Sequence, residues 1–190
     1  DVARILRVKG ARVGFLLCED AWNDPCEAYA INPWRRLADA SPDLVIGINA
    51  SPSHLGKRTS RHELFSESSR RHGLPFLYVN QVGGHDQVVF DGGSFAVEPG
   101  SGVVAEWALF QEDSALVGFR AGRFESCGAP PLPAPDPTPL VDAEFQRRQI
   151  VLGLRDYARR CGFSKVVVGS SGGIDSALTL ALAVEALGAG

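Results

Sequence analysis

Short apolar runs alternate with polar segments along the first half of this chain. The runs at 13–17, 44–48 and 74–79 are flanked by glycine, proline or acidic residues, which is typical of buried strands. Two charged stretches between them, 33–40 and 59–72, contain few strand-forming residues and favour helices. The pattern therefore predicts an α/β fold in which strands and helices alternate.

The residues that follow are predicted to be β-structure. Residues 83–86 read Gly-Gly-His-Asp and predict a turn between the third strand and a fourth strand at 87–99. One further short edge strand is expected within 115–126.

A proline-rich stretch then interrupts the pattern. Six prolines lie between positions 130 and 139, and this density allows neither a helix nor a central strand. We predict a semi-rigid linker at 126–140 that joins a first domain, 1–125, to the start of a second, 141–190.

The second domain is predicted to open with an amphipathic helix at 142–161. Ile150, Leu154, Tyr157 and Cys161 recur there at helical spacing, and Gly162 follows. An apolar strand at 166–168, a glycine-rich turn and an apolar helix complete a strand–loop–helix unit.

Composition narrows the class of protein. An apolar content of 45% and a charged content of 22% are typical of a soluble globular protein. A net charge of −3 gives no reason to expect a nucleic acid partner, and no apolar run is long enough to span a membrane. We expect a cytoplasmic protein whose cysteines are free thiols, because no signal-peptide pattern or C-x-x-C pair is present. The lack of any methionine and the final apolar helix suggest an internal piece of a longer protein.

The glycine-rich turn after 166–168 has the composition of a phosphate-binding loop. Glycines let the backbone approach an anion, and the N-terminus of the next helix presents free N–H groups. Ser171 and Ser176 can add hydroxyl donors, whereas the carboxylate of Asp175 would repel phosphate unless Mg²⁺ lies between the two charges. The alternative is an ordinary turn in which Asp175 only begins the helix. The predicted ATP-binding residues are Gly169, Ser170, Ser171, Gly172, Gly173, Ile174, Asp175 and Ser176, with Asp175 binding Mg²⁺ through ATP.

The string SGGIDS at 171–176 resembles the SGGxDS signature of the N-type ATP pyrophosphatases. The resemblance implies a doubly wound, Rossmann-like domain that binds the pyrophosphate of ATP and cleaves between the α- and β-phosphates. The GKS or GKT of a Walker loop is missing.

Cys18 is the candidate nucleophile because it follows the predicted strand 13–17 and precedes Glu19 and Asp20. A thiol at such a strand end can project into a cleft, where the next backbone N–H groups can stabilise an oxyanion. The alternative is a buried structural cysteine, which is common at strand ends. Glu19 and Asp20 can either orient neighbours of Cys18 or simply form the turn.

Three blocks of sequence bear on this choice, CEDAW at 18–22, NASPSHLGK at 49–57 and VNQVGGHDQVVFDGGSFAV at 79–97. They resemble the glutaminase domain of the glutamine-dependent NAD synthetases, which belongs to the nitrilase superfamily and has a four-layered αββα fold. The resemblance implies that Cys18 is the nucleophile and that Ser51 and Lys57 bind the substrate glutamine. The Glu and Lys of the family's triad have no counterpart in the 17 residues before Cys18, so we expect them outside this chain.

The activity that this resemblance implies is an ATP-dependent carbon–nitrogen ligase. Glutamine would be hydrolysed at Cys18, and the ammonia would convert deamido-NAD to NAD after ATP and Mg²⁺ activate the nicotinate carboxylate. The implied partners are L-glutamine, deamido-NAD and ATP, and we expect the complete protein to be a homo-oligomer. Two alternatives are a stand-alone nitrilase-type amidase, against which SGGIDS argues, and an inactive truncated module.

The remaining polar and aromatic residues are given structural roles. The histidines have no metal-ligand spacing and are expected on the surface or in loops: His54, His62, His72 and His85. Apart from Lys57, the basic cluster is expected on a solvated helix face: Arg58, Arg61, Arg70 and Arg71. Trp22, Trp34 and Phe76 are expected in the core.

Overall fold

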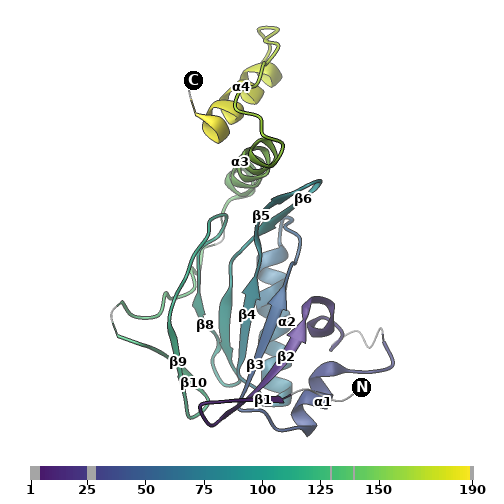
Figure 1. Cartoon of the computed structure of the whole chain (residues 1–190), viewed down its shortest axis with the longest axis vertical. Helices are drawn as coiled ribbons and strands as arrows, with labels where there is room; N and C mark the ends of the chain where they lie inside the picture. Colours follow the sequence, from purple (N-terminus) through teal and green to yellow (C-terminus); the bar gives the residue numbers. More distant parts are fainter. Residues whose placement is uncertain (1–4, 25–28, 129, 139, 189–190) are drawn as a thin grey trace.

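The computed structural model describes residues 5–24, 29–128, 130–138 and 140–188. A mixed, six-stranded sheet forms its main body, and two helices lie apart from this sheet at one end of the molecule (Figure 1). The α/β class predicted from the apolar pattern is therefore confirmed. Cys26 and Pro139 lie outside the described residues.

The main sheet has the strand order β1-β2-β3-β4-β7-β8. Its three middle strands, β2 to β4, are parallel, and the others pair antiparallel with their neighbours. The strands are β1 (Ile5–Val8), β2 (Ala11–Leu17), β3 (Leu44–Asn49), β4 (Phe76–Asn80), β7 (Phe95–Glu98) and β8 (Gly102–Glu106). Because β2, β3 and β4 are parallel, their carboxyl ends meet at one edge of the sheet, where the candidate site lies.

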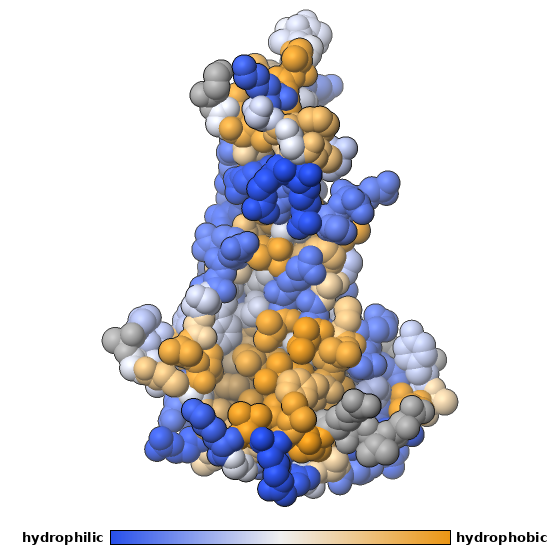
Figure 2. All heavy atoms as spheres, viewed as in Figure 1, coloured by the Kyte–Doolittle hydropathy of each residue, from blue (hydrophilic) through white to orange (hydrophobic). Residues whose placement is uncertain are grey.

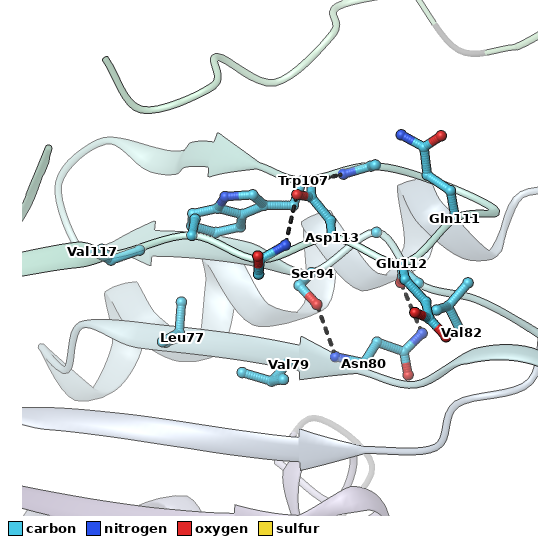
Figure 3. A pocket seen from close by; sticks show the side chains of 15 residues that line it. Leu77, Val79, Asn80, Val82, Ser94, Trp107, Gln111, Glu112, Asp113 and Val117 are labelled. Carbon is cyan, nitrogen blue, oxygen red and sulfur yellow. Dashed lines mark hydrogen bonds between the residues drawn. The ribbon is translucent and has the colours of Figure 1, made fainter. Parts of the chain in front are cut away.

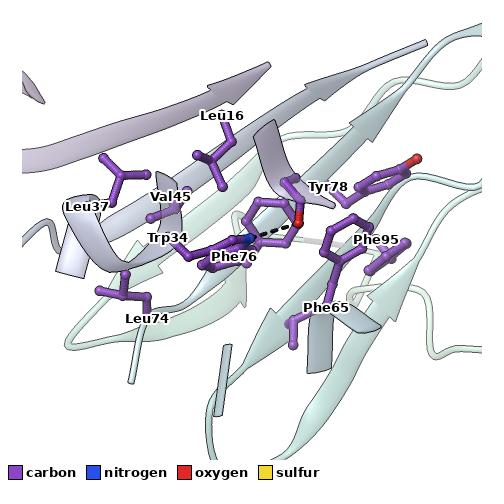
Figure 4. Packing of buried hydrophobic residues seen from close by; sticks show 11 residues of the cluster. Leu16, Trp34, Leu37, Val45, Phe65, Leu74, Phe76, Tyr78 and Phe95 are labelled. Atoms are coloured by element: carbon purple, nitrogen blue, oxygen red, sulfur yellow. Dashed lines mark hydrogen bonds between the residues drawn. The ribbon is translucent and has the colours of Figure 1, made fainter. Parts of the chain in front are cut away.

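Two helices, α1 (Pro33–Asp39) and α2 (Lys57–His72), cover one face of this sheet. Gly73 ends α2 in the left-handed conformation at φ +66°, as the sequence predicts, although the helix begins two residues before the predicted 59. Aromatic side chains fill the space between helices and sheet (Figure 4). The Nε1–H of Trp34 donates to the carbonyl oxygen of Ala21 at 2.9 Å, so even the indole nitrogen is paired in this core.

Trp34 and Phe76 are fully buried, as predicted, and Trp22 is partly buried against the same cluster. Each side chain of this size stabilises the fold by roughly 1.5–3 kcal/mol through burial alone. The buried residues of this cluster are Leu16, Ala21, Trp34, Leu37, Val45, Phe65, Leu74, Phe76, Tyr78, Phe95 and Val97.

The opposite face of the sheet is only partly covered. A hairpin of β9 (Val117–Arg120) and β10 (Arg123–Ser126) packs over the end formed by β7 and β8. Towards the carboxyl ends of β2, β3 and β4, the side chains of Leu17, Ile48 and Val79 remain 60%, 50% and 42% exposed. Figure 2 shows apolar residues gathered over this open face of the sheet.

The strand predicted at 87–99 is wrong in detail. Residues 83 and 84 belong to β5 (Val82–His85), which pairs with β6 (Val88–Asp91) in a separate hairpin. Gly92 and Gly93, both at positive φ, then redirect the chain into β7 of the main sheet. The turn therefore lies at 86–87, and two glycines split the predicted fourth strand into β6 and β7.

Helix α3 (Asp142–Arg160) confirms the helix predicted after the linker, but a different face is buried. Ile150 and Tyr157 are about half exposed, whereas Phe145 and Leu152 are buried beside Phe110. The β5–β6 hairpin and the segment around Phe110, which local periodicity does not reveal, determine which face of α3 is covered.

Close contacts join α3 to the sheet domain. Asp156 accepts a hydrogen bond from the backbone N–H of Gly84 at 2.8 Å, and the Ser53 hydroxyl donates to Oε1 of Gln149 at 3.0 Å. A Cβ atom at Gly84 would lie 3.0 Å from the Cα atom of Gly153, so a glycine at 84 allows the helix and the hairpin to touch.

The proline-rich stretch forms neither helix nor strand among its described residues. It nevertheless lies against the sheet domain. Arg58 donates a hydrogen bond to the carbonyl oxygen of Asp136, and the backbone N–H of Glu106 donates one to the carbonyl oxygen of Pro133.

The prediction of a strand at 166–168 is wrong for this structure. No neighbouring strand lies beside it in the described part of the chain, and Val167 is fully exposed. Helix α4 (Ile174–Leu187) forms as predicted.

Among the residues with a described position, no helix combines the length and the apolar character needed to cross a membrane.

Candidate functional site

Cys18 begins a short 3-10 helix, η1 (Cys18–Ala21), at the carboxyl end of β2. Its φ of +44° lies in the left-handed region, which is uncommon for a residue with a side chain and occurs often at functional sites. The Asp20 carboxylate accepts a hydrogen bond from the N–H of Leu17, and Glu19 accepts one from the N–H of Trp22 through its carbonyl oxygen. These bonds hold the turn that carries the half-buried thiol.

The Cys18 thiol faces the end of the neighbouring strand. Its Sγ atom lies 4.0 Å from the carbonyl oxygen of Ala50, the residue after β3. Parallel pairing of β2 with β3 brings these two strand ends together. The loop that begins at Ala50 and ends at α2 therefore borders the thiol. Ser51 lies in this loop, and Lys57 is the first residue of α2.

Lys57 is the first residue of α2, and its side chain bends back over the segment after Cys18. Its Nζ atom lies 3.8 Å from the centroid of the Trp22 ring. Burial lowers the pKa of Lys57, the positive charge of Arg61 lowers it further, and the carboxylate of Glu19 opposes both. The structure thus brings Lys57 near Cys18, as the two sequence blocks suggest.

Ser51 is 3% exposed and is held from two sides. Its N–H donates to Oδ1 of Asn80 at 3.0 Å, and its carbonyl oxygen accepts from Nη2 of Arg61 at 2.8 Å. Arg61 in turn is paired with Asp91 through Nη1 at 2.8 Å. The prediction of a solvated position for Arg61 is wrong, since the residue is 1% exposed.

The other basic residues of α2 differ in the same way. Arg58 forms a half-buried bidentate pair with the carboxylate of Glu106 and is also not on a solvated face. Arg70 is exposed and pairs with Glu67, as expected of a solvated face, while Arg71 is partly exposed and contacts Asp24. Burial alone would raise the pKa of Glu106. Hydrogen bonds from His62 and Arg58 outweigh burial and hold this pKa below its usual value.

Two of the four histidines also contradict the prediction of surface or loop positions. His62 packs edge-on against Phe95 and contacts Glu106, and His72 stacks on Trp34 and binds Asp24 at 2.7 Å. His54 and His85 are exposed as predicted.

No group of three or more His, Cys, Asp or Glu residues in the described ranges could hold a metal ion.

Sequence reasoning missed two polar residues that support the site, Asn80 and Asp91. It also missed Asp24, a buried carboxylate away from the site, at the C-terminal end of α2. Asp91 is fully buried, and the available signal was its position within the run VVFDGG, where a carboxylate interrupts an apolar strand. A charge in such a place requires a buried partner. Asn80 likewise ends an apolar strand.

A hollow of about 410 Å³ lies beside this polar cluster, at the carboxyl end of β4 (Figure 3). Asn80, Ser94 and Trp107 line it, and Ser94 accepts a hydrogen bond from the N–H of Asn80 at 3.0 Å. Cys18, Ser51 and Lys57 are not among its lining residues. Asn80 therefore connects the hollow to Ser51, but the hollow itself is a separate feature.

The predicted ATP-binding loop lies far along the molecule from the sheet, directly before α4 (Figure 1). The Ser176 hydroxyl donates to the carbonyl oxygen of Gly173 at 2.9 Å and lies 3.3 Å from the Ser171 hydroxyl. Gly172 has a φ of +84°, so the backbone conformation there requires glycine, although a Cβ atom would meet nothing within 4 Å.

Within the described ranges, no side chain caps the N-terminus of α4, so its first N–H groups stay available to an anion. Asp175 lies in the first turn of this helix, with its side chain exposed. The structure does not bring this loop together with Cys18, which fits two separate sites.

Comparison with known proteins gives consistent results. The sequence profile of the NAD synthase family matches residues 146–190. A glutamine-dependent NAD(+) synthetase of Synechocystis is 44% identical over 184 residues, covering 95% of this chain and 32% of that protein. One of Rhodobacter capsulatus is 40% identical over 97% of this chain and 32% of its own length. The chain thus spans about a third of the length of these curated relatives.

Solved structures agree with these sequence relatives. A glutamine-dependent NAD+ synthetase of Acinetobacter baumannii, solved in complex with ADP, superposes with a TM-score of 0.82 and is 34% identical. The match covers 100% of this chain and 34% of that one. A glutamine-dependent NAD(+) synthetase of Cytophaga hutchinsonii has the same fold over 97% of this chain and 26% of its own, with a TM-score of 0.69 and 20% identity.

Proposed function

Because this chain is similar along nearly its whole length to glutamine-dependent NAD(+) synthetases, we propose that it is a segment of an enzyme of that family. The proposed reaction is the ATP-dependent amidation of deamido-NAD to NAD, with ammonia released from glutamine. One observation carries the proposal. The alignment with the Synechocystis protein, at 44% identity, includes both the turn of Cys18 and the loop before α4. One family therefore accounts for both parts of the chain.

The proposed glutaminase step uses Cys18 as the nucleophile. As the thiol gives up its proton, its sulfur attacks the carbon of the glutamine side-chain amide. The C–N bond breaks, and the nitrogen takes up this proton and leaves as ammonia. Water then hydrolyses the glutamyl thioester, which returns the thiol and releases glutamate. The left-handed turn at Cys18 supports this role, because it directs the thiol towards the loop at Ala50 rather than into the core.

Ser51 and Lys57 are proposed to hold the substrate glutamine beside this thiol. Both belong to the segment that borders Cys18, and both can donate hydrogen bonds. The ammonium of Lys57 also supplies a positive charge that suits a carboxylate of the substrate. Its lowered pKa indicates a partly desolvated position, as expected for a group that lines a binding site.

The second proposed site is the loop 169–176, which would bind the pyrophosphate of ATP. The uncapped N–H groups of α4, the left-handed backbone of Gly172 and the hydroxyls of Ser171 and Ser176 fit an anion of this kind. Asp175 would hold Mg²⁺, which neutralises phosphate charge while the nicotinate carboxylate of deamido-NAD is activated. This chain contributes the loop, and its side chains orient the anion.

The organisation that we propose follows the sequence boundaries. Residues 1–125 would belong to a nitrilase-like glutaminase domain, 126–140 to the linker and 141–190 to a doubly wound ATP pyrophosphatase domain. We also propose that the complete enzyme acts in the cytoplasm as a homo-oligomer.

The test is an assay of NAD formation by the complete enzyme, with ATP, Mg²⁺, deamido-NAD and either glutamine or ammonia. The parent enzyme should use both nitrogen donors. Cys18→Ala should abolish synthesis from glutamine and leave synthesis from ammonia unchanged, whereas Cys161→Ala, at an exposed thiol directly after α3, should support both. Equal loss with both donors in Cys18→Ala would show that Cys18 is not the glutaminase nucleophile.

A further inference from the structure

Arg61 and Asp91 form an ion pair that is almost completely enclosed by the protein. The side chains are 2% and 0% exposed, and Nη1 of Arg61 donates to both carboxylate oxygens of Asp91, at 2.8 and 2.9 Å. Removing two charges from water costs several kcal/mol per ion, and a pair of apolar residues would often be as stable. Stability alone therefore gives a weak reason for a charged pair at this position.

The other donors of Arg61 all point at one short segment. Nη2 donates to the carbonyl oxygens of Ser51 and Pro52, at 2.8 and 3.2 Å. Nη2 and Nε also donate to the Ser51 hydroxyl oxygen, at 3.1 and 3.3 Å. A guanidinium has five N–H protons in a fixed, planar fork. Arg61 makes six hydrogen bonds with Asp91, Ser51 and Pro52, so Nη2 shares one of its two protons between two acceptors.

These bonds determine what the Ser51 hydroxyl can do. A serine hydroxyl accepts two hydrogen bonds and donates one. Arg61 occupies both acceptor positions, so only the hydroxyl proton remains for another partner. The buried Tyr78 hydroxyl, which has no other hydrogen-bond partner among the described residues, lies near this proton and competes with a ligand for it. The same bonds hold the backbone next to Ala50, whose carbonyl oxygen lies 4.0 Å from the Sγ atom of Cys18.

We propose that Arg61 and Asp91 are positioning residues of the glutamine site. Asp91 orients Arg61, and Arg61 holds Ser51 so that its hydroxyl donates to an oxygen atom of the substrate and not to its ammonium group. Both residues act through Ser51 and do not themselves touch glutamine. This inference rests on the proposed function, and it adds the pair that fixes the direction of one substrate contact.

The test is a double-mutant cycle in the complete enzyme, made of Ser51→Ala, Asp91→Asn and the double variant. Asp91→Asn should raise the KM for glutamine about tenfold, the loss expected for one hydrogen bond to a charged group. Synthesis from ammonia should keep the parent kcat. In the Ser51→Ala background, Asp91→Asn should add no further rise in KM, because the hydroxyl through which it acts is already gone.

A matched control is available at the other end of α2. Asp24 is also a buried carboxylate bound by an arginine of this helix, Arg71, at 3.2 Å. Asp24→Asn should lower the thermal midpoint without raising the KM for glutamine. A rise in KM equal to that of Asp91→Asn would mean that loss of any buried charge has this effect, and the positioning role would be wrong.

Other outcomes also decide the question. If Asp91→Asn does not fold, Arg61→Lys takes its place in the cycle, since a lysine keeps the charge but lacks the fork. Should neither variant fold, the pair is a structural part of the core and the proposal fails. Two results with an active parent enzyme contradict this inference alone. In the first, the variants keep the parent KM for glutamine. In the second, Asp91→Asn raises this KM equally with Ser51 and with Ala at position 51. A parent enzyme that makes no NAD from glutamine contradicts the proposed function as well.

Discussion

The ammonium of Lys57 lies 3.8 Å from the centroid of the Trp22 ring, so the first residue of α2 packs onto the segment that follows Cys18. A contact of this kind contributes roughly 0.5–1 kcal/mol at a partly exposed site. It also limits where the ammonium can lie and keeps it beside the segment that follows Cys18.

The first prediction concerns this ammonium. Lys57→Ala should raise the KM for glutamine by about 10- to 100-fold, because a hydrogen bond to a charged group is worth roughly 1.5–3 kcal/mol. The kcat with ammonia should not change. Arg70→Ala removes another cation of α2, one that is exposed and pairs with Glu67, and it should leave the KM unchanged. A KM for glutamine that stays at the parent value in Lys57→Ala would exclude Lys57 from the binding site.

A second prediction separates metal binding from helix formation at Asp175. If this carboxylate holds Mg²⁺ beside ATP, Asp175→Asn should require more Mg²⁺ for half-maximal synthesis from ammonia and should reduce the rate at saturation. Glutamine hydrolysis at Cys18 should continue, since the loop and the thiol lie in different parts of the molecule.

The helix itself should tolerate this change. A carboxylate in the first turn stabilises a helix by only about 0.3–1 kcal/mol, so the thermal midpoint should fall slightly. Synthesis at the parent rate with an unaltered Mg²⁺ titration would show that Asp175 only begins the helix.

A third prediction compares two glycines at the contact between α3 and the β5–β6 hairpin. Gly84→Ala should lower the thermal midpoint, because its Cβ atom would lie 3.0 Å from the Cα atom of Gly153, and neither backbone can move without separating the two elements. Gly153→Ala should cost little or even stabilise. Its Cβ atom would meet only the side chain of Val89, and alanine gains about 1 kcal/mol over glycine inside a helix. Equal effects of the two substitutions would mean that the contact is looser than described.

The fourth prediction concerns the acid range. Burial of Asp24 raises its pKa, but hydrogen bonds from Asn32, His72 and Ser68 together outweigh this effect and hold the pKa below its usual value. A carboxyl group whose pKa is lower in the folded state stabilises the fold above its unfolded pKa. This contribution is lost as the pH falls through the folded pKa.

Asp24→Asn should therefore lower the thermal midpoint at neutral pH, by the equivalent of about 1–3 kcal/mol. The parent and the variant should converge as the pH falls below the usual carboxyl range. The measurement is a series of melting curves between neutral and strongly acidic pH. A constant difference between the two proteins would show that the charge of Asp24 is not what stabilises the fold.

Local sequence was sufficient to predict an element where that element depends mainly on its own residues. The strands β2, β3 and β4 are apolar runs bounded by turn residues, and Gly73 ends α2 as expected. It was insufficient where a distant partner decides the outcome. Residues 166–168 are as apolar as the other strands, yet a strand forms only beside another strand.

The candidate site shows the same division. Cys18, Ser51 and Lys57 were identified through motifs, and the structure brings their segments together. Arg61 was assigned to a solvated face because charged residues surround it in the sequence. Its burial depends on Asp91, which lies 30 positions later, at the end of β6. No periodicity within α2 contains that information.

The contacts between α3 and the sheet domain have a consequence for limited proteolysis. A protease that cuts the exposed, proline-containing segment between β10 and α3 would break the only covalent connection between these two parts within the described residues. The fragments would nevertheless stay associated, because Phe145 remains packed against Phe110, Asp156 against Gly84 and Gln149 against Ser53. The nicked protein would elute as one species under native conditions and as two bands after denaturation.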